Sequence, residues 1–176
     1  MNKNLLITGP PGCGKTTLVK RLIAQLRHLK PVGFYTEEIR EGGIRTGFSL
    51  NGLDGRTSIL AHVDVKSRYR VGKYGVDLEA FEESIGSIPF FDPNTQMIVI
   101  DEIGKMECFS AMFTRLLDDI FDANTPVIAT IALKGSGSIA SIKRRPDVEL
   151  FGLTRENQDM LFEKILWDSK TFLAMV

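Results

Sequence analysis

One octapeptide near the start of the chain constrains its fold more than any other feature. The residues Gly9-Pro10-Pro11-Gly12-Cys13-Gly14-Lys15-Thr16 fit the pattern G-x-x-x-x-G-K-[ST] at every defined position. A short apolar run at 5–7 precedes them, and leucines at helical spacing follow them over 15–29, up to Pro31. The octapeptide therefore stands between a predicted strand and a predicted helix, which is the setting in which such a loop holds phosphate.

A loop of this kind indicates a triphosphate site. Its backbone N–H groups form a concave nest for phosphate oxygens, and the N-terminus of the next helix adds roughly half a positive charge. In this arrangement Lys15 reaches the β- and γ-phosphates, and the Thr16 hydroxyl binds Mg²⁺. The predicted nucleotide-binding residues of this segment are Gly9, Pro10, Pro11, Gly12, Cys13, Gly14, Lys15, Thr16 and Thr17.

A second apolar run, at 97–100, ends in two acidic residues. We expect Asp101 at the carboxyl end of a buried strand, where it binds Mg²⁺ together with Thr16. Glu102 then lies beside the γ-phosphate and orients or deprotonates a water for in-line attack, and the alternative is a structural acid. The other residues that we assign to this nucleotide-binding segment are Ile98, Val99, Ile100, Ile103, Gly104 and Lys105.

The order of elements predicts an α/β fold. Strands and helices alternate along most of the chain, which favours three layers around a mainly parallel sheet. Glycine-rich breaks separate three consecutive β-rich runs, so residues 32–63 are expected to extend that sheet as an antiparallel meander. The predicted strands are 5–7, 32–39, 44–50, 57–63, 97–100, 126–133 and 148–153. The predicted helices are 15–29, 78–88, 106–124, 138–143 and a last one that Thr154 caps, with Glu156 in its first turn.

Length and charge set the remaining bounds. A chain of 176 residues is expected to form one domain, 1–176. Lysine plus arginine number 22, as do aspartate plus glutamate, so no excess of positive charge indicates nucleic-acid binding, although the basic, irregular stretch 66–75 leaves that partner open. The sequence has no signal-peptide pattern and no apolar run long enough to cross a bilayer. We therefore expect a cytoplasmic monomer that binds nucleoside triphosphates and no membrane.

Several charged residues outside the two motifs are open to two interpretations. Lys105 could contact phosphate or pair with a neighbouring acid. Arg144 or Arg145 could act as a catalytic arginine on the transferring phosphoryl group, or could form a solvated basic turn. Arg155 and Asn157 could line the base or ribose, or could cap a helix.

The phrase Asp101-Glu102-Ile103-Gly104-Lys105-Met106-Glu107 is not general to P-loop proteins. Together with the octapeptide, it resembles the small nucleoside-triphosphatase family of archaea, thermophilic bacteria and animals, whose animal members are called cancer-related nucleoside triphosphatases. Further segments that look like this family are Gly33-Phe34-Tyr35-Thr36-Glu37-Glu38, Arg45-Thr46-Gly47-Phe48 and Thr154-Arg155-Glu156-Asn157. The resemblance spans nearly the whole chain and implies a RecA-like P-loop core with a mixed sheet. It also implies Mg²⁺-dependent hydrolysis of nucleoside triphosphates (ATP, GTP, CTP and UTP) to diphosphate and phosphate, with broad base tolerance.

Two alternatives stand beside hydrolysis. A nucleotide or nucleoside kinase would carry the same loop, although the sequence has no lid segment with several arginines. A nucleotide-dependent switch associated with RNA or DNA would hydrolyse slowly, only to reset itself. The sequence also lacks an Asn/Thr-Lys-x-Asp run, which reads guanine in GTPases, and this absence favours broad base tolerance.

Overall fold

The computed structural model describes residues 3–173, and within that range nine strands form one sheet. The strands are β1 (Asn4–Gly9), β2 (Val32–Glu41), β3 (Ile44–Gly52), β4 (Thr57–His62), β5 (Arg70–Val71), β6 (Tyr74–Val76), β7 (Ile98–Ile103), β8 (Val127–Ala132) and β9 (Val148–Gly152). Their order across the sheet is β5-β6-β4-β3-β2-β7-β8-β1-β9. From β2 to β9 in this order the neighbours are parallel, and from β2 back to β5 they are antiparallel. The predicted sheet, with a parallel part extended by antiparallel strands, is confirmed.

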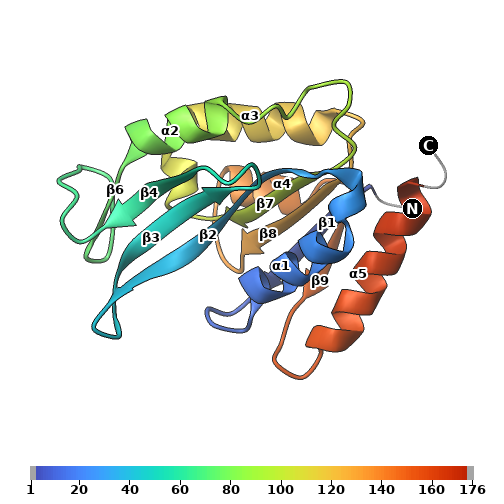
Figure 1. The fold of residues 1–176 in the computed structure, drawn as a ribbon, viewed down its shortest axis with the longest axis horizontal. Helices are drawn as coiled ribbons and strands as arrows, with labels where there is room; N and C mark the ends of the chain where they lie inside the picture. Colours follow the sequence, from blue (N-terminus) through green and yellow to red (C-terminus); the bar gives the residue numbers. More distant parts are fainter. Residues whose placement is uncertain (1–2, 174–176) are drawn as a thin grey trace.

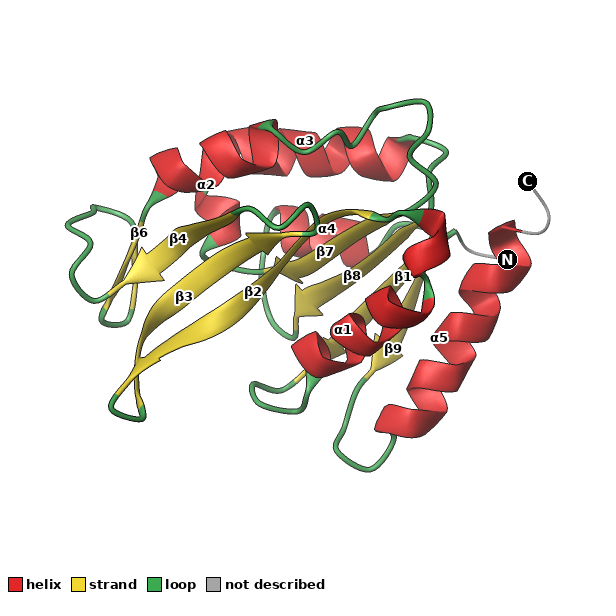
Figure 2. Ribbon diagram, viewed as in Figure 1, coloured by secondary structure: helices red, strands yellow, loops and turns green. Residues whose placement is uncertain are grey.

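Helices cover both faces of the sheet and make the fold three-layered (Figures 1 and 2). The helices are α1 (Lys15–Gln25), α2 (Leu78–Gly86), α3 (Ala111–Asp122), α4 (Ser138–Lys143) and α5 (Gln158–Leu173). Figure 1 shows α2 and α3 on the side of the sheet away from α1 and α5, and α4 packs into the same core as α3. Among the described residues, no helix combines the length and the apolar character that a membrane span needs.

The side chains of β7 show why the central strands are apolar throughout. Ile98 and Ile100 belong to the core under α2, α3 and α4, whereas Met97 and Val99 belong to the core under α1 and α5. Because successive side chains of a strand point to opposite faces, a strand that is covered on both sides shows no polar alternation. Asp101 is the first polar residue of this strand.

Three helices are shorter than predicted, and the smallest difference is in α2, which ends at Gly86 instead of residue 88. The Ser110 hydroxyl accepts a hydrogen bond of 2.9 Å from the Phe113 N–H and caps α3, which begins at Ala111 instead of residue 106. A separate 3₁₀ turn, Glu107–Phe109, precedes this cap. The helix predicted at 15–29 ends as α1 at Gln25, and its last turn is the 3₁₀ turn Arg27–Leu29.

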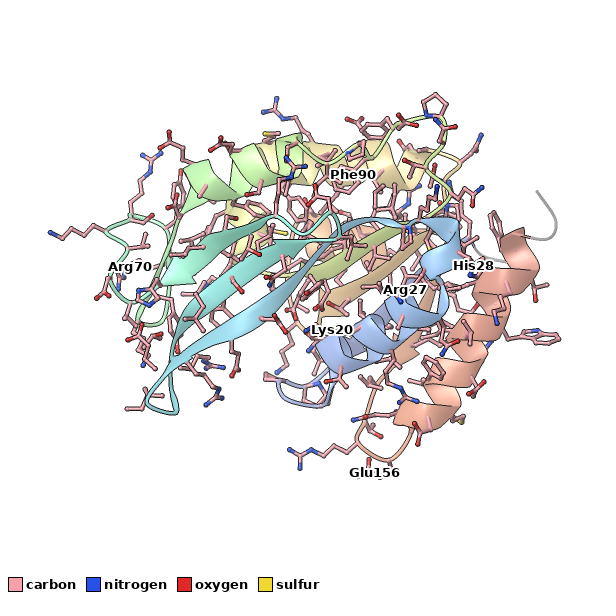
Figure 3. The ribbon with its side chains drawn as sticks, viewed as in Figure 1. Lys20, Arg27, His28, Arg70, Phe90 and Glu156 are labelled. Carbon is pink, nitrogen blue, oxygen red and sulfur yellow. The ribbon has the colours of Figure 1, made fainter. Side chains whose placement is uncertain are left out.

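The prediction that Thr154 caps the last helix is wrong. Its hydroxyl accepts a hydrogen bond of 3.3 Å from the Glu156 N–H, and its own N–H donates to Asn157 Oδ1 at 2.8 Å. These bonds close a turn in front of Gln158, where α5 begins, and Figure 3 shows Glu156 on the loop before that helix. Side-chain oxygens of threonine and asparagine satisfy backbone groups in turns as well as at helix ends, so the sequence did not separate the two.

The segment 66–75, which the sequence predicted to be irregular, contains the short hairpin of β5 and β6. Arg70 pairs with Gly75, and Val71 pairs with Tyr74. The hairpin forms the end of the sheet opposite β9, and Figure 3 shows Arg70 on the side of the molecule away from α5. The basic side chains of this segment, Lys66, Arg68, Arg70 and Lys73, are not among the residues that line the cleft beside the loop that precedes α1.

Candidate nucleotide-binding site

The two sequence motifs meet at the carboxyl edge of the parallel strands. β1 and β7 both pair in parallel with β8, so the loop after β1 and the end of β7 lie at the same edge. A cleft of about 730 Å³ opens there. Its lining consists of Pro11, Gly12, Gly14, Lys15, Thr16, Thr17, Thr36, Glu37, Glu38, Arg45, Phe48, Ser49 and Glu102. Residues of both motifs thus face one space.

Some residues that were predicted to bind nucleotide lie outside this lining. The buried ones are Gly9, Cys13, Ile98, Val99, Ile100, Asp101, Ile103 and Gly104. The exposed ones are Pro10 and Lys105. The apolar residues of β7 are core side chains that hold the strand end in place, which differs from their predicted contact with a nucleotide.

Gly14 and Gln158 together shape the phosphate loop. Gly14 has φ 97° and is the cap residue of α1, and a Cβ there would lie 2.7 Å from Gln158 Nε2. The same nitrogen donates a hydrogen bond of 2.8 Å to the Cys13 carbonyl, so α5 supports the loop from outside. Sequence reasoning missed Gln158 because the contact joins residues that are 145 positions apart and no motif marks it.

Lys15 lies between the phosphate loop and the end of β7. Its side chain is only 11% exposed. The ammonium group donates a hydrogen bond of 3.2 Å to the Gly9 carbonyl and stands 3.8 Å from Glu102 Oε2. One cation therefore links the two motifs directly.

Asp101 is fully buried next to this cation. The Thr130 hydroxyl on β8 donates a hydrogen bond of 2.5 Å to Asp101 Oδ1, whereas Oδ2 has no hydrogen-bond partner among the described residues. Burial raises the pKa of Asp101, and the hydroxyls of Thr130 and Thr16 and the charge of Lys15 oppose that rise. A carboxylate oxygen without a partner, close to a threonine hydroxyl, is the kind of oxygen donor that Mg²⁺ takes.

Two further carboxylates lie next to Asp101. Burial raises the pKa of Glu102, Lys15 lowers it, and the Asp101 charge raises it further. Glu107 is 5% exposed, and its pKa is raised to about 8 by burial, with the charges of Glu102 and Asp101 adding to the effect. A Cβ on Gly104 would lie 2.9 Å from Glu107 Oε2 and 3.0 Å from Glu102 Oε1, so a glycine here leaves room for both side chains.

The hairpin of β2 and β3 forms a further wall of the cleft. Arg45 Nη1 donates a hydrogen bond of 2.7 Å to Glu38 Oε1, and Arg45 Nε donates one of 3.0 Å to the Tyr74 hydroxyl. Its guanidinium carbon lies 5.2 Å from the centre of the Phe48 ring and 5.6 Å from that of Tyr74. Sequence reasoning did not assign Arg45 a role, because a lone arginine in a meander carries no motif.

In the basic turn at 143–145, the Lys143 ammonium group donates to the carbonyls of Ala132 and Leu133 at the end of β8, whereas Arg145 lies at the opposite edge of the sheet. Arg145 bonds to Asp122, at the end of α3, and to Asp147, just before β9. The Asp147 carboxylate also accepts a hydrogen bond from Asn4, at the start of β1. Arg144 is exposed in this turn and lines no part of the cleft. Neither arginine lines the cleft, and the contacts of Arg145 place it at the amino edge, which favours the basic turn over the predicted catalytic arginine.

Asn157 is likewise occupied in its own loop. Its Nδ2 donates a hydrogen bond of 2.8 Å to the Gly152 carbonyl, and its Oδ1 accepts one from Thr154. Arg155 is exposed beside it. The structure thus places the Asn157 amide in the turn between β9 and α5, and neither residue lines the cleft.

A second hollow, of about 360 Å³, lies between the turn after β3 and α2, and Arg56 and Glu83 are among its lining residues. It contains none of the motif residues.

Within residues 3–173 there is also no group of three or more His, Cys, Asp and Glu side chains arranged to hold a metal ion. The cleft at the carboxyl edge is therefore the candidate site.

Known proteins share this sequence and this fold. A family model described as NTPase matches residues 4–166. Nucleoside-triphosphatase THEP1 of Thermotoga sp. (strain RQ2) is 45% identical over 163 residues, which cover 92% of this chain and 92% of that protein. The crystal structure of THEP1 from the hyperthermophile Aquifex aeolicus matches with a TM-score of 0.80 at 38% identity, over 92% of this chain and 96% of that one. The solution structure of a human cancer-related nucleoside triphosphatase matches with a TM-score of 0.82 at 34% identity, over 96% and 97%.

The family match begins at the first residue of β1 and ends within α5. It therefore includes the phosphate loop, the end of β7 and the hairpin wall of the cleft. By this match, and by its likeness to two solved structures over almost its full length, the chain belongs to the NTPase family of P-loop proteins.

Proposed function

We propose that this protein hydrolyses nucleoside triphosphates to diphosphate and phosphate, with the help of Mg²⁺ and with little preference for the base. The observation that carries the proposal is the meeting of Lys15, Thr16 and Glu102 in one cleft, next to the buried Oδ2 of Asp101, which no group within residues 3–173 hydrogen-bonds. The names of the Thermotoga and human relatives, both nucleoside-triphosphatases, support the same reaction.

The phosphate loop and Lys15 bind the triphosphate in this proposal. Backbone N–H groups of the loop and the start of α1 receive the phosphate oxygens. Lys15 exchanges its contacts with the Gly9 carbonyl and Glu102 for the β- and γ-phosphates, because phosphate oxygens carry more negative charge than a carbonyl. The exchange releases Glu102 from its cationic partner.

Glu102 then acts as the general base. It orients the attacking water and takes a proton from it as the γ-phosphoryl group is transferred. A pKa raised by burial suits this task, because a carboxylate that holds its proton more firmly is a stronger base. The water oxygen bonds to the γ-phosphorus as its proton passes to Glu102 Oε. The bond between the γ-phosphorus and the bridging oxygen breaks, and its electron pair leaves on the nucleoside diphosphate.

Thr16 and Asp101 are the residues that would hold Mg²⁺. When it is bound, the ion supplies positive charge that offsets the charge of the β- and γ-phosphates. Two protein ligands would leave positions for water and phosphate oxygens, which Mg²⁺ commonly takes as its further ligands. Thr130 holds the Asp101 carboxylate in place from β8.

A phosphate-release assay tests this proposal. ATP, GTP, CTP and UTP, and their diphosphates, are incubated with the protein in the presence and absence of Mg²⁺. We expect phosphate from all four triphosphates, from none of the diphosphates, and only when Mg²⁺ is present. Release of phosphate from only one of the four triphosphates would contradict the base tolerance. Tight binding of ATP without any release of phosphate would contradict hydrolysis.

The same protein can be tested for transfer to an acceptor other than water. ATP labelled at the γ-phosphate is incubated with nucleosides and nucleoside monophosphates, and the destination of the label is followed. Hydrolysis predicts that the label appears in inorganic phosphate at a rate that acceptors do not change. Faster appearance of the label in an acceptor would instead identify a kinase.

A further inference from the structure

The cleft lining contains more acidic side chains than the single positive charge of Lys15 can neutralise. Its lining includes Glu37, Glu38 and Glu102, and its cationic residues are Lys15 and Arg45. During phosphoryl transfer, negative charge spreads over the oxygens of the transferring group, and many P-loop enzymes stabilise it with an arginine. Arg144 and Arg145 are not among the residues that line the cleft, whereas Arg45 is.

We propose that Arg45 contacts the γ-phosphoryl group and stabilises the charge that develops during its transfer. The inference rests on the hydrolysis proposed above and adds to it a catalytic residue from outside the two motifs. The sequence suggested Arg144 or Arg145 for this role. The proposal assigns the role instead to Arg45, which lies on β3 in the antiparallel part of the sheet.

The register of β2 explains how a residue of the meander reaches the site. β2 pairs in parallel with β7 up to the pair Tyr35–Asp101, and it then continues to Glu41 beyond the end of that pairing. β3 returns beside it, with Phe48 opposite Glu38 and Arg45 opposite Arg40. The hairpin therefore extends past the edge of the sheet at which the nucleotide is proposed to bind. β2 is the neighbour of β7 in the sheet, and Figure 1 shows the hairpin beside α1.

The guanidinium group of Arg45 is held in place and still has donors to spare. The Glu38 carboxylate and the Tyr74 hydroxyl accept from Nη1 and Nε, and the rings of Phe48 and Tyr74 support the planar group. Arg45 Nη2 has no hydrogen-bond partner among residues 3–173, and the side chain is 43% exposed. A planar fork with free N–H groups matches the spacing of phosphate oxygens.

The other cationic side chains near the cleft either pair with an acid or lie outside the cleft lining. Lys20 pairs with Glu37 and lies 4.5 Å from the centre of the Tyr35 ring. Lys105 is exposed and does not line the cleft. Arg40 bonds to Glu38 and to the Gly43 carbonyl, and it is also absent from the lining.

Two variants, Arg45→Ala and Arg45→Gln, test the proposal. The glutamine variant keeps hydrogen-bonding capacity and much of the packing while it removes the charge, so it remains informative if the alanine variant does not fold. We expect kcat for ATP to fall by at least ~10²-fold, because a catalytic arginine is worth about 10³–10⁵ in rate, while KM changes little. Thermal unfolding of each variant identifies those that are folded.

Arg40→Ala is the matched control. Arg40 is an arginine of the same hairpin and bonds to the same Glu38 carboxylate, but it lies outside the cleft lining. Its removal changes the ion pairing of Glu38 as the Arg45 variants do. We expect its kcat to stay within about threefold of wild type, as is usual for an exposed charge.

A transition-state analogue gives a readout that does not depend on turnover. Binding of ADP with Mg²⁺ is measured with and without aluminium fluoride, which mimics the transferring phosphoryl group. We expect wild type and Arg40→Ala to bind ADP more tightly when aluminium fluoride is present, and we expect Arg45→Gln to lose this gain while it binds ADP alone as wild type does.

The outcomes separate this proposal from the proposed function. If wild type hydrolyses ATP and a folded Arg45 variant retains kcat within about threefold and an unchanged response to aluminium fluoride, the role of Arg45 is overturned and hydrolysis stands. If wild type itself releases no phosphate from any triphosphate, the proposed function fails and the role of Arg45 fails with it.

Discussion

The ammonium group of Lys15 stands 3.8 Å from the carboxylate of Glu102. The two residues come from different motifs, 87 positions apart in the chain (102 minus 15), and meet because β1 and β7 end at the same edge of the sheet. Each group offsets part of the other's charge at this distance. A triphosphate that draws Lys15 away leaves Glu102 as a free base beside the phosphoryl group, and this change is the basis of the first prediction.

Replacement of Glu102 by Gln should separate binding from turnover. The variant lacks a proton acceptor, so phosphate release should fall by about 10²–10⁴-fold. Affinity for ATP should be kept or increased, because the amide no longer competes for Lys15. Phosphate release and titration with a fluorescent ATP analogue measure the two quantities.

Glu37→Gln is the control for this variant, because Glu37 also lines the cleft but pairs with Lys20 on α1. It should retain kcat within about threefold of wild type, as expected for a partly exposed ion pair. Wild-type turnover in Glu102→Gln would remove Glu102 from the role of base.

The pH dependence of phosphate release should report the raised pKa of Glu102. The base must be ionised to accept a proton, so the rate should fall as the pH falls through that pKa. Because burial raises the pKa above the ordinary glutamate value of 4.5, the loss should occur at a higher pH than for an exposed glutamate. A profile of kcat/KM against pH measures the inflection, and a profile that is flat down to the ordinary glutamate range would contradict it.

Asp101→Asn should weaken the response to Mg²⁺. The substitution removes the negative charge next to Thr16, so a higher Mg²⁺ concentration should be needed for half-maximal phosphate release. The increase should be on the order of 10-fold or more, the usual effect of altering a metal ligand or its partner. The shift of the unfolding temperature by Mg²⁺ with ADP should shrink in parallel, because a ligand stabilises only the state that it binds.

Asp118→Asn serves as the control for this substitution, since Asp118 is an exposed residue of α3. It should respond to Mg²⁺ as wild type does. An unchanged Mg²⁺ dependence in Asp101→Asn would assign the ion to other residues.

Glu107 should make the stability of the metal-free protein depend on pH. Its pKa is about 8 in the folded chain against an ordinary 4.5, so the folded state binds the proton more firmly than the unfolded state. The stabilisation by protonated Glu107 is complete below the unfolded value and is lost as the pH rises through 8. Between these two values the free energy of unfolding should fall by up to ~1.4 kcal/mol per pH unit.

The contribution of Glu107 is the difference between wild type and Glu107→Gln, measured by chemical denaturation at a series of pH values. Glutamine has a similar shape and does not titrate, so the variant should show a shallower decline between pH 4.5 and about 8, and the two slopes should agree above that range. Identical slopes in the two proteins would show that Glu107 does not titrate in this range.

Gln158→Ala should disturb the phosphate loop from a distance. The variant loses the hydrogen bond to the Cys13 carbonyl and the contact with Gly14. KM for ATP should rise by about 3- to 10-fold, because one hydrogen bond is worth about 1 kcal/mol, while kcat should change less. Glu163→Ala, an exposed site on the same helix, should leave KM unchanged. A KM like that of wild type in Gln158→Ala would make the contact with the loop dispensable.

The sequence by itself was enough to predict the layout of the fold and the position of its phosphate loop. A glycine-rich turn between a strand and a helix is a local pattern, and so is the apolar run that ends at Asp101. The order of strands and helices then predicted a three-layer α/β fold with an antiparallel extension, as the structure has it. Local patterns failed where one side chain can serve two local structures, as Thr154 does in the turn before α5.

Only the tertiary structure decided which charged residues share the site. The sequence offered Arg144 or Arg145 as a catalytic arginine, yet neither lines the cleft, and Arg145 bonds to Asp122 at the amino edge. Arg45 lies in a hairpin without any motif, yet the length of β2 beyond its pairing with β7 brings it to the cleft. The raised pKa of Glu107 likewise follows from burial beside other carboxylates, which sequence spacing does not measure. Contacts between distant segments depend on strand register and on which edge of the sheet a loop occupies, and these are properties of the folded chain.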